Sequence, residues 1–196
     1  MEKINFIKTF IPKGDFNEKY EHGGMMVRHL AAVLDEKMGA YECYECTVPI
    51  GEYDEGEIQK AFVEFSAKMD ALKLKQAKAD KIAEITAYDT SSSVNGFLLN
   101  GLLVWLDKAT RVGLMNSTTI AKAAGQETTT LWLGGLKLVV DCDKAIQLLS
   151  ALEMYALECF NVTASHKAAV RELKSIEEVE AYDYKAGYPK MLEMSV

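Results

Sequence analysis

Hydrophobic residues in the second half of the chain recur in two similar blocks. Each block has an apolar run, a two-residue turn, a second apolar run and then Asp-Lys-Ala. The turns are Asn100-Gly101 and Gly134-Gly135, and glycine readily takes the positive φ angles that a two-residue hairpin turn needs. The repeated pattern therefore predicts two β-hairpins, each leading into a helix.

The apolar positions differ between the two hairpins. A tight turn at Gly134-Gly135 places Trp132 opposite Lys137 on one face of the second hairpin. The other face then holds Leu131, Leu133, Leu136 and Leu138. The first hairpin is apolar at almost every position, so we expect both of its faces to be covered. Asp107 and Asp143 open the Asp-Lys-Ala triplets and are predicted to cap the helices that follow.

A long amphipathic helix is predicted over residues 55–87. Its apolar positions alternate at steps of four and three residues, as along the seam of a coiled coil. These positions are Ile58, Phe62, Phe65, Met69 and Leu72. Such a helix would extend about 50 Å, and its narrow apolar stripe has to be covered by another copy, by a neighbouring protein or by its own chain. The first two alternatives make these side chains partner-binding residues, and the first predicts a homo-oligomer.

The segment before this helix, residues 1–54, is predicted to form a small α/β region. Its apolar pattern predicts a strand over residues 4–11, a loop over 15–24, a short amphipathic helix over 25–38 and a strand over 41–48. The helix prediction depends on apolar residues that recur at helical spacing.

The remaining residues, 88–196, are predicted to form a domain built from the two hairpin–helix units. The helical stretch of the first unit ends by Gly125, and the helix of the second continues to about Leu173. The apolar stripe of the second helix consists of Ile146, Leu149, Leu152, Tyr155, Ala156 and Phe160. Ser175 starts a capping box for a last short helix, and residues 191–194 are apolar enough for a final strand. The predicted fold class is α+β and helix-rich, with two β-hairpin–helix units after a long amphipathic helix.

Charge and cysteine content exclude several classes of protein. The chain has 22 basic and 29 acidic residues and a formal net charge of −7, and its basic residues are scattered, which argues against nucleic-acid binding. No apolar run approaches the length of a membrane span, and residues 1–8 lack the apolar core of a signal peptide. The four cysteines of a chain this long form no disulfide framework and favour a reducing cytoplasm.

Residues with catalytic or metal-binding chemistry are present but form no recognisable motif. Cys43 and Cys46 fall on a predicted strand, where they point to opposite faces and cannot share one metal ion. Asp141 and Asp143 are paired carboxylates, but Asp143 is expected to cap a helix. His166 has no accompanying phosphate loop, nucleophile elbow or zinc motif. These observations predict no catalytic residue, no cofactor and no metal.

Trp105 and Trp132 are the remaining candidates, one on each hairpin. Aromatic side chains on a sheet either fill a core or form a surface that stacks on sugars or anchors a partner protein. Both alternatives stay open from the sequence. A saccharide- or small-ligand-binding module predicts a concave pocket in which one tryptophan faces solvent beside convergent polar groups.

A series of short motifs between Lys81 and the C-terminus carries a family resemblance. They are Ile82-Ala83-Glu84-Ile85, Ala87-Tyr88-Asp89, Val94-Asn95, Trp105-Leu106-Asp107-Lys108-Ala109-Thr110-Arg111-Val112-Gly113-Leu114, Lys122-Ala123-Ala124-Gly125, Thr128-Thr129-Thr130-Leu131-Trp132, Leu149-Ser150-Ala151-Leu152-Glu153, Ala156-Leu157-Glu158-Cys159-Phe160-Asn161-Val162-Thr163, Val179-Glu180-Ala181-Tyr182-Asp183-Tyr184 and Gly187-Tyr188-Pro189. Together they resemble a domain family of unknown function that occurs in bacteriophages and in prophage regions of gut Bacteroidales.

The resemblance implies a non-enzymatic phage or prophage protein, because related domains occur at the C-termini of tail-fibre and tail-fibre-assembly proteins. It implies contacts with other phage structural proteins, in the cytoplasm of the host bacterium during assembly or in the virion. It supplies no catalytic residue, and residues 1–54 lie outside it. A host-directed regulatory protein is a further alternative.

Overall fold

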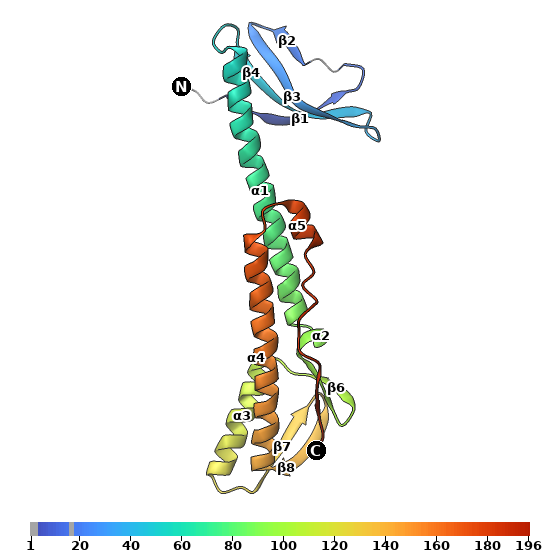
Figure 1. Cartoon of the computed structure of the whole chain (residues 1–196), viewed down its shortest axis with the longest axis vertical. Helices are drawn as coiled ribbons and strands as arrows, with labels where there is room; N and C mark the ends of the chain where they lie inside the picture. Colours follow the sequence, from blue (N-terminus) through green and yellow to red (C-terminus); the bar gives the residue numbers. More distant parts are fainter. Residues whose placement is uncertain (1–3, 16–17) are drawn as a thin grey trace. The chain divides into compact units, whose positions relative to one another are not determined.

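The structure is a computed structural model that describes residues 4–15 and 18–196. The chain divides into two compact units, Met1–Lys73 and Leu74–Val196, and the boundary falls inside helix α1, Glu55–Asp89 (Figure 1). The α+β fold class predicted from the sequence is confirmed, as is the long helix. Across the described residues, no helix is both long enough and apolar enough to cross a membrane.

The N-terminal unit is built on an antiparallel sheet. Its strands are β1 (Ile7–Pro12), β2 (Lys19–His22), β3 (Met25–Asp35) and β4 (Ala40–Pro49), in the order β1-β4-β3-β2. The strands predicted over residues 4–11 and 41–48 are therefore confirmed, with small shifts at their ends.

Two predictions for this unit are wrong. The predicted loop over 15–24 contains strand β2, which pairs with β3; positions 16 and 17 lie outside the described residues. The predicted helix over 25–38 is strand β3. This strand has one extra residue between Leu30 and Val33, and Ala31 takes a φ of 53° there. Such a bulge shifts the alternation of side chains along the strand, so its apolar positions lose the period of two and imitate helical spacing.

One face of the sheet is covered by the first part of α1. Ile58 and Phe62, which are 1% and 8% exposed, form a buried cluster with Leu30, Cys46 and Val48. This part of the predicted coiled-coil stripe therefore packs against its own chain, which is one of the alternatives that the stripe left open.

Aromatic rings extend this cluster by one helical turn. The ring centroid of Phe65 lies 5.0 Å from that of Tyr44 and 5.1 Å from that of Phe6. These are tilted and edge-on contacts of the kind that aromatic pairs prefer, and they fix the first turns of α1 on the sheet.

The C-terminal unit contains the second part of α1 and the rest of the chain. Its further elements are α2 (Ser92–Asn95), β5 (Gly96–Leu99), β6 (Leu102–Trp105), α3 (Lys108–Ala123), β7 (Thr128–Leu133), β8 (Leu136–Asp141), α4 (Cys142–Glu172), α5 (Ile176–Ala181) and β9 (Leu192–Met194). Strands β6, β5 and β9 form one sheet, with β9 parallel to β5, and β7 pairs with β8. Both hairpins, the helices that follow them, the capping box at Ser175 and the final strand are confirmed.

The second hairpin has the register expected from its turn. Leu133 pairs with Leu136 and Trp132 with Lys137, and the Trp132 side is open to solvent. Gly134 takes a φ of 58°, and a Cβ there would lie 3.1 Å from Cγ1 of Val104 on β6. The second turn therefore packs closely against the first hairpin, which leaves little room for a larger residue.

Only one face of the first hairpin is covered. Phe97 and Val104 are buried on the covered face, whereas Leu103 and Trp105, on the opposite face, are 58% and 40% exposed. Leu102 lies on the covered face but beside the turn, where it is 54% exposed. The prediction that both faces are covered is wrong, because β6 is an edge strand and the buried cluster of this unit lies on one side of it.

Aspartate side chains cap both helices that follow the hairpins. Asp107 accepts a hydrogen bond from the backbone N–H of Thr110 and caps α3, as predicted. For α4 the cap is Asp141, which accepts from the backbone N–H of Asp143. The prediction that Asp143 caps α4 is wrong, because α4 begins directly at the end of β8. Asp143 instead lies in the first turn and pairs with Lys122.

The second part of α1 lies beside α4, and the two helices run in opposite directions (Figure 1). The Nζ of Lys78 donates to the carbonyl oxygen of Arg171 at 2.7 Å, and the Oγ1 of Thr163 donates to Oδ1 of Asp89 at 2.8 Å. The core beside them joins both hairpins to α4 and consists of Val94, Phe97, Leu99, Val104, Leu106, Leu131, Leu133, Val140, Ala145, Leu149, Leu152, Tyr155 and Cys159.

Candidate functional site

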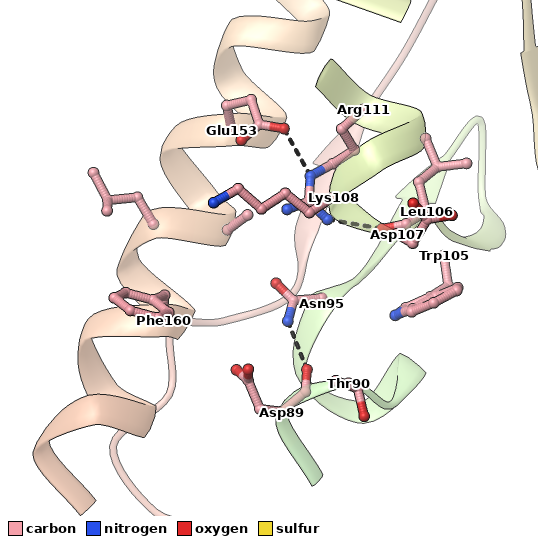
Figure 2. Close-up of a pocket in the computed structure, with 12 residues that line it drawn as sticks. Asp89, Thr90, Asn95, Trp105, Leu106, Asp107, Lys108, Arg111, Glu153 and Phe160 are labelled. Atoms are coloured by element: carbon pink, nitrogen blue, oxygen red, sulfur yellow. Dashed lines mark hydrogen bonds and ion pairs between the residues drawn. The ribbon is translucent and has the colours of Figure 1, made fainter. Parts of the chain in front are cut away.

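A groove opens on the C-terminal unit between three parts of the fold (Figure 2). Its walls are the end of α1 with α2, the junction between β6 and α3, and one face of α4. It encloses about 390 Å³. Its lining residues are Asp89, Thr90, Asn95, Trp105, Leu106, Asp107, Lys108, Arg111, Glu153, Ala156, Leu157 and Phe160.

The α4 wall follows from helical spacing. Glu153, Ala156, Leu157 and Phe160 fall at i, i+3, i+4 and i+7, so they lie on one face over two turns, a length of about 10 Å. Ala156 is buried, whereas Leu157 and Phe160 are 50% and 60% exposed. The wall therefore presents an apolar surface to solvent along one side of the groove.

Arg111 joins the α3 wall to the α4 wall. Its Nε donates to Oε1 of Glu153 at 2.8 Å, and its Nη1 donates to the carbonyl oxygen of Leu106 at 2.7 Å. Its side chain is only 10% exposed. The ion pair is partly shielded from water and holds the guanidinium at a fixed place in the groove.

Asp89 and Asn95 lie at the other end of the groove. The side-chain Nδ2 of Asn95 donates to the carbonyl oxygen of Asp89 at 2.7 Å, and the Asp89 carboxylate accepts from the hydroxyl of Thr163. These bonds secure the end of α1 to α2 and α4, and they fix the direction of both polar side chains.

Asp107 has a structural role at the rim of the groove. Its Oδ1 accepts from the backbone N–H of Thr110 at 2.8 Å and its Oδ2 from the Thr110 hydroxyl at 2.7 Å. These hydrogen bonds, the one from the hydroxyl above all, hold the pKa of Asp107 below its usual range. Both of its oxygens are used by the helix cap.

The residues predicted to bind a partner lie in different environments. Ile58 and Phe62 are buried in the core of the N-terminal unit, and Phe65 and Met69 are partly buried. Leu72, Trp105 and Trp132 are 50%, 40% and 59% exposed. Ile58 and Phe62 are covered within their own unit, and the binding of a partner by this set of residues stays a prediction.

The two tryptophans are surface residues, so the core alternative is wrong for both. Trp105 lines the groove and Trp132 lies outside its lining. A tryptophan beside convergent polar groups is the arrangement that a small-ligand module predicts.

The other candidates from the sequence have structural roles. Burial raises the pKa of the thiols of Cys43 and Cys46, which makes them poor nucleophiles at neutral pH. The two ring nitrogens of His166 are paired with the hydroxyl of Tyr182 and the carbonyl oxygen of Ala186. Within the described part of the chain, no three His, Cys, Asp or Glu side chains are grouped so that they could hold a metal ion.

Sequence reasoning missed most of the groove. The sequence pattern places Phe160 on the apolar stripe of α4 together with Leu149 and Leu152, yet Phe160 is 60% exposed. Phe160 lies seven residues after Glu153, so the two share a face of α4 that carries both polar and apolar side chains. This spacing is the sequence signal that could have revealed the groove wall. No local signal indicates that Asp89 and Asn95 meet this face.

Residues 76–186 match a protein family described as Domain of unknown function (DUF4376). The chain belongs to this family. The DUF4376 match lies within the C-terminal unit and includes every residue that lines the groove. No curated protein and no solved structure matches the chain.

Proposed function

We propose that the chain is a non-enzymatic structural or assembly protein of a phage or prophage, associated with the tail or tail fibre. It acts through self-association and contacts with other phage structural proteins, in the host cytoplasm during assembly or in the virion. The observation that carries the proposal is the amount of large apolar surface that the hairpins of the DUF4376 domain leave open to solvent.

On the second hairpin, Trp132 and Val139 are 59% and 67% exposed. Trp132 pairs with Lys137, so Val139 is its diagonal neighbour on the same face. On the first hairpin, the edge strand β6 exposes Leu102, Leu103 and Trp105. Grouped apolar side chains on a surface favour protein–protein contact, and an edge strand without charge or proline favours it further.

The phage association is supported by the resemblance of residues 81–196 to domains of tail-fibre and tail-fibre-assembly proteins. The exposed side chain of Leu72 on α1 adds an apolar position outside the hairpins. Ile58 and Phe62 do not contribute, because they already pack against their own chain.

Size-exclusion chromatography with light scattering tests this function. The wild-type chain is expected to form oligomers, and Trp132→Asp or Leu72→Asp is expected to shift them toward monomer. Lys137→Asp is the matched control, because it changes charge on the face of Trp132 without removing apolar surface. Monomers at every concentration for the wild type would contradict self-association. Substitutions at Phe62 or Phe65 do not serve here, because they disrupt the N-terminal core.

A second candidate is a module that binds a saccharide or another small ligand through a hairpin tryptophan. It is favoured by the position of Trp105 in a groove with Asn95, Arg111 and Glu153. It differs from the first candidate in its ligand and does not require self-association.

A further inference from the structure

The groove contains the buried guanidinium of Arg111, and protein acceptors occupy only some of its N–H donors. Two N–H groups of Arg111 are occupied by Glu153 and by the carbonyl oxygen of Leu106. A guanidinium has further N–H donors, which these two acceptors leave available. Figure 2 shows this guanidinium pointing into the groove. A side chain that is nine-tenths buried and keeps donors directed at a cavity favours a ligand that accepts hydrogen bonds.

Acceptor groups lie across the groove from Arg111. Asn95 uses its Nδ2 to bond the Asp89 carbonyl, which leaves its amide oxygen for other donors. Figure 2 shows that oxygen pointing toward Arg111, and it shows the Asp89 carboxylate at the same end of the groove as Asn95. The groove therefore has donors at one end and acceptors at the other.

Aromatic rings form the remaining two sides. Trp105 lies on the β6 side and Phe160 on the α4 side, with the polar groups between them (Figure 2). Both rings are substantially exposed, so each can receive the apolar face of a ligand ring.

The charges of the lining nearly cancel. Asp89, Asp107 and Glu153 stand against Lys108 and Arg111. Arg111 is paired with Glu153, and both oxygens of Asp107 are occupied by the helix cap. A phosphate or a strongly cationic ligand would find no dominant opposite charge here, which favours a neutral ligand.

We propose that this groove binds a neutral saccharide ring stacked on Trp105, whose hydroxyls accept from Arg111 and Lys108 and donate to Asn95 and Asp89. A hydroxyl both donates and accepts, so one ring satisfies both ends of the groove. The volume of about 390 Å³ lies within the range of small-ligand pockets. This inference rests on the second candidate function. It shares Trp105 with the first but does not require self-association.

Two single-tryptophan proteins give the first test, since the chain has two tryptophans. Trp132→Phe leaves Trp105 as the only reporter, and Trp105→Phe leaves Trp132. Each is titrated with glucose, galactose, mannose and N-acetylglucosamine up to about 50 mM, because weak sites have dissociation constants near the millimolar range. At least one sugar is expected to produce a saturable emission change in Trp132→Phe and none in Trp105→Phe.

The second test compares affinities by calorimetry or NMR titration. Trp105→Ala is expected to weaken binding of that sugar at least about tenfold, and Lys108→Ala severalfold, whereas the control Trp132→Ala leaves it unchanged. Circular dichroism checks that each variant is folded. If Trp105→Ala unfolds, the exposed Lys108 carries the test.

The proposal is overturned if none of the neutral sugars binds saturably, or if Trp132→Ala weakens binding as much as Trp105→Ala. It is also overturned if glucuronate or inorganic phosphate binds more tightly than every neutral sugar, or if an apolar peptide binds at Trp105 and no sugar does. Light scattering on the same samples separates the two functions. Self-association without sugar binding leaves the assembly function standing and refutes only this inference.

Discussion

The two units of the chain bury their apolar side chains in different ways. In the N-terminal unit, one face of a sheet meets the first part of α1, and the contact is a small cluster around Ile58 and Phe62. In the DUF4376 domain, two hairpins are enclosed with α4 in a larger core that includes Phe97 and Leu149. The first arrangement covers the apolar stripe of a helix. The second covers one side of each hairpin and leaves the other side open.

This difference separates stability from recognition. The apolar side chains of α1 that the sequence marks most strongly, Ile58 and Phe62, hold the N-terminal unit together. The exposed tryptophans and the groove belong to the DUF4376 domain, and neither tryptophan is part of its buried core. We therefore expect substitutions in the cores to change stability and substitutions at the tryptophans to change binding.

The largest effects are expected from matched core substitutions in the two units. Phe97→Ala and Phe62→Ala remove side chains that are 0% and 8% exposed, and each should cost about 3–5 kcal/mol because it leaves a cavity. Both tryptophans lie in the DUF4376 domain, so tryptophan fluorescence follows its unfolding, whereas circular dichroism follows both units.

In denaturant titrations, Phe97→Ala should lower the midpoint seen by fluorescence. Phe62→Ala should lower the midpoint of the N-terminal unit, which dichroism detects, and leave the midpoint seen by fluorescence unchanged. An equal fluorescence shift for both variants would mean that the units unfold as one, and the comparison between them would fail for stability.

Helix caps give a smaller effect. Asp141→Ala should cost about 1 kcal/mol because it leaves backbone N–H groups at the start of α4 unpaired, and fluorescence should detect the loss. Asp143→Ala should cost less, since Asp143 does not cap the helix. The counterpart in the N-terminal unit is Asp54, whose Oδ1 accepts from the backbone N–H of Glu57 at 2.8 Å. Asp54→Ala should lower the midpoint seen by dichroism more than the midpoint seen by fluorescence. A larger loss of stability from Asp143→Ala than from Asp141→Ala would contradict the assignment of Asp141 as the cap of α4.

Tyr155 provides a pH-dependent effect that is confined to the DUF4376 domain. Its hydroxyl donates to the carbonyl oxygen of Val94 at 2.8 Å, and burial raises its pKa to about 12. In the unfolded chain the Tyr155 hydroxyl ionises near pH 10. The neutral, buried Tyr155 therefore stabilises the folded state fully below pH 10, and this contribution to the free energy of unfolding is lost as the pH rises from about 10 to 12. Tyr155→Phe should cost about 1 kcal/mol at neutral pH. It should also flatten the alkaline fall in the fluorescence midpoint, and an unchanged alkaline fall would show that other groups cause it.

The smallest effect on stability is expected at the surface. Trp132→Ala should change the free energy of unfolding by less than about 0.5 kcal/mol, because Trp132 is 59% exposed and its cross-strand partner Lys137 is exposed as well. Thermal melts followed by dichroism measure this directly. A loss as large as that of Phe97→Ala would show that Trp132 contributes to the core, and recognition would lose its main support.

The hairpins show how far the sequence repeat reaches. The caps Asp107 and Asp141 have the same separation along the chain as the turns at Asn100 and Gly134. The Asp-Lys-Ala triplets suggested a different alignment, and the error at Asp143 followed from it. The turns and the caps therefore correspond between the two units of the repeat. The Asp-Lys-Ala triplets do not correspond, because the second triplet begins two residues after its cap.

The sequence by itself determined the local features of this protein: the glycine turns, the register of the second hairpin, the long helices and the capping box at Ser175. These depend on positive φ angles, side-chain alternation and bonds between residues a few positions apart. Tertiary structure decided that residues 25–35 form a strand, which part of α1 is covered, and which face of each hairpin is exposed. It also assembled the groove from Asp89, Trp105, Arg111 and Phe160. The reason is that pairing and burial between distant segments depend on the whole fold, and no short stretch of sequence encodes them.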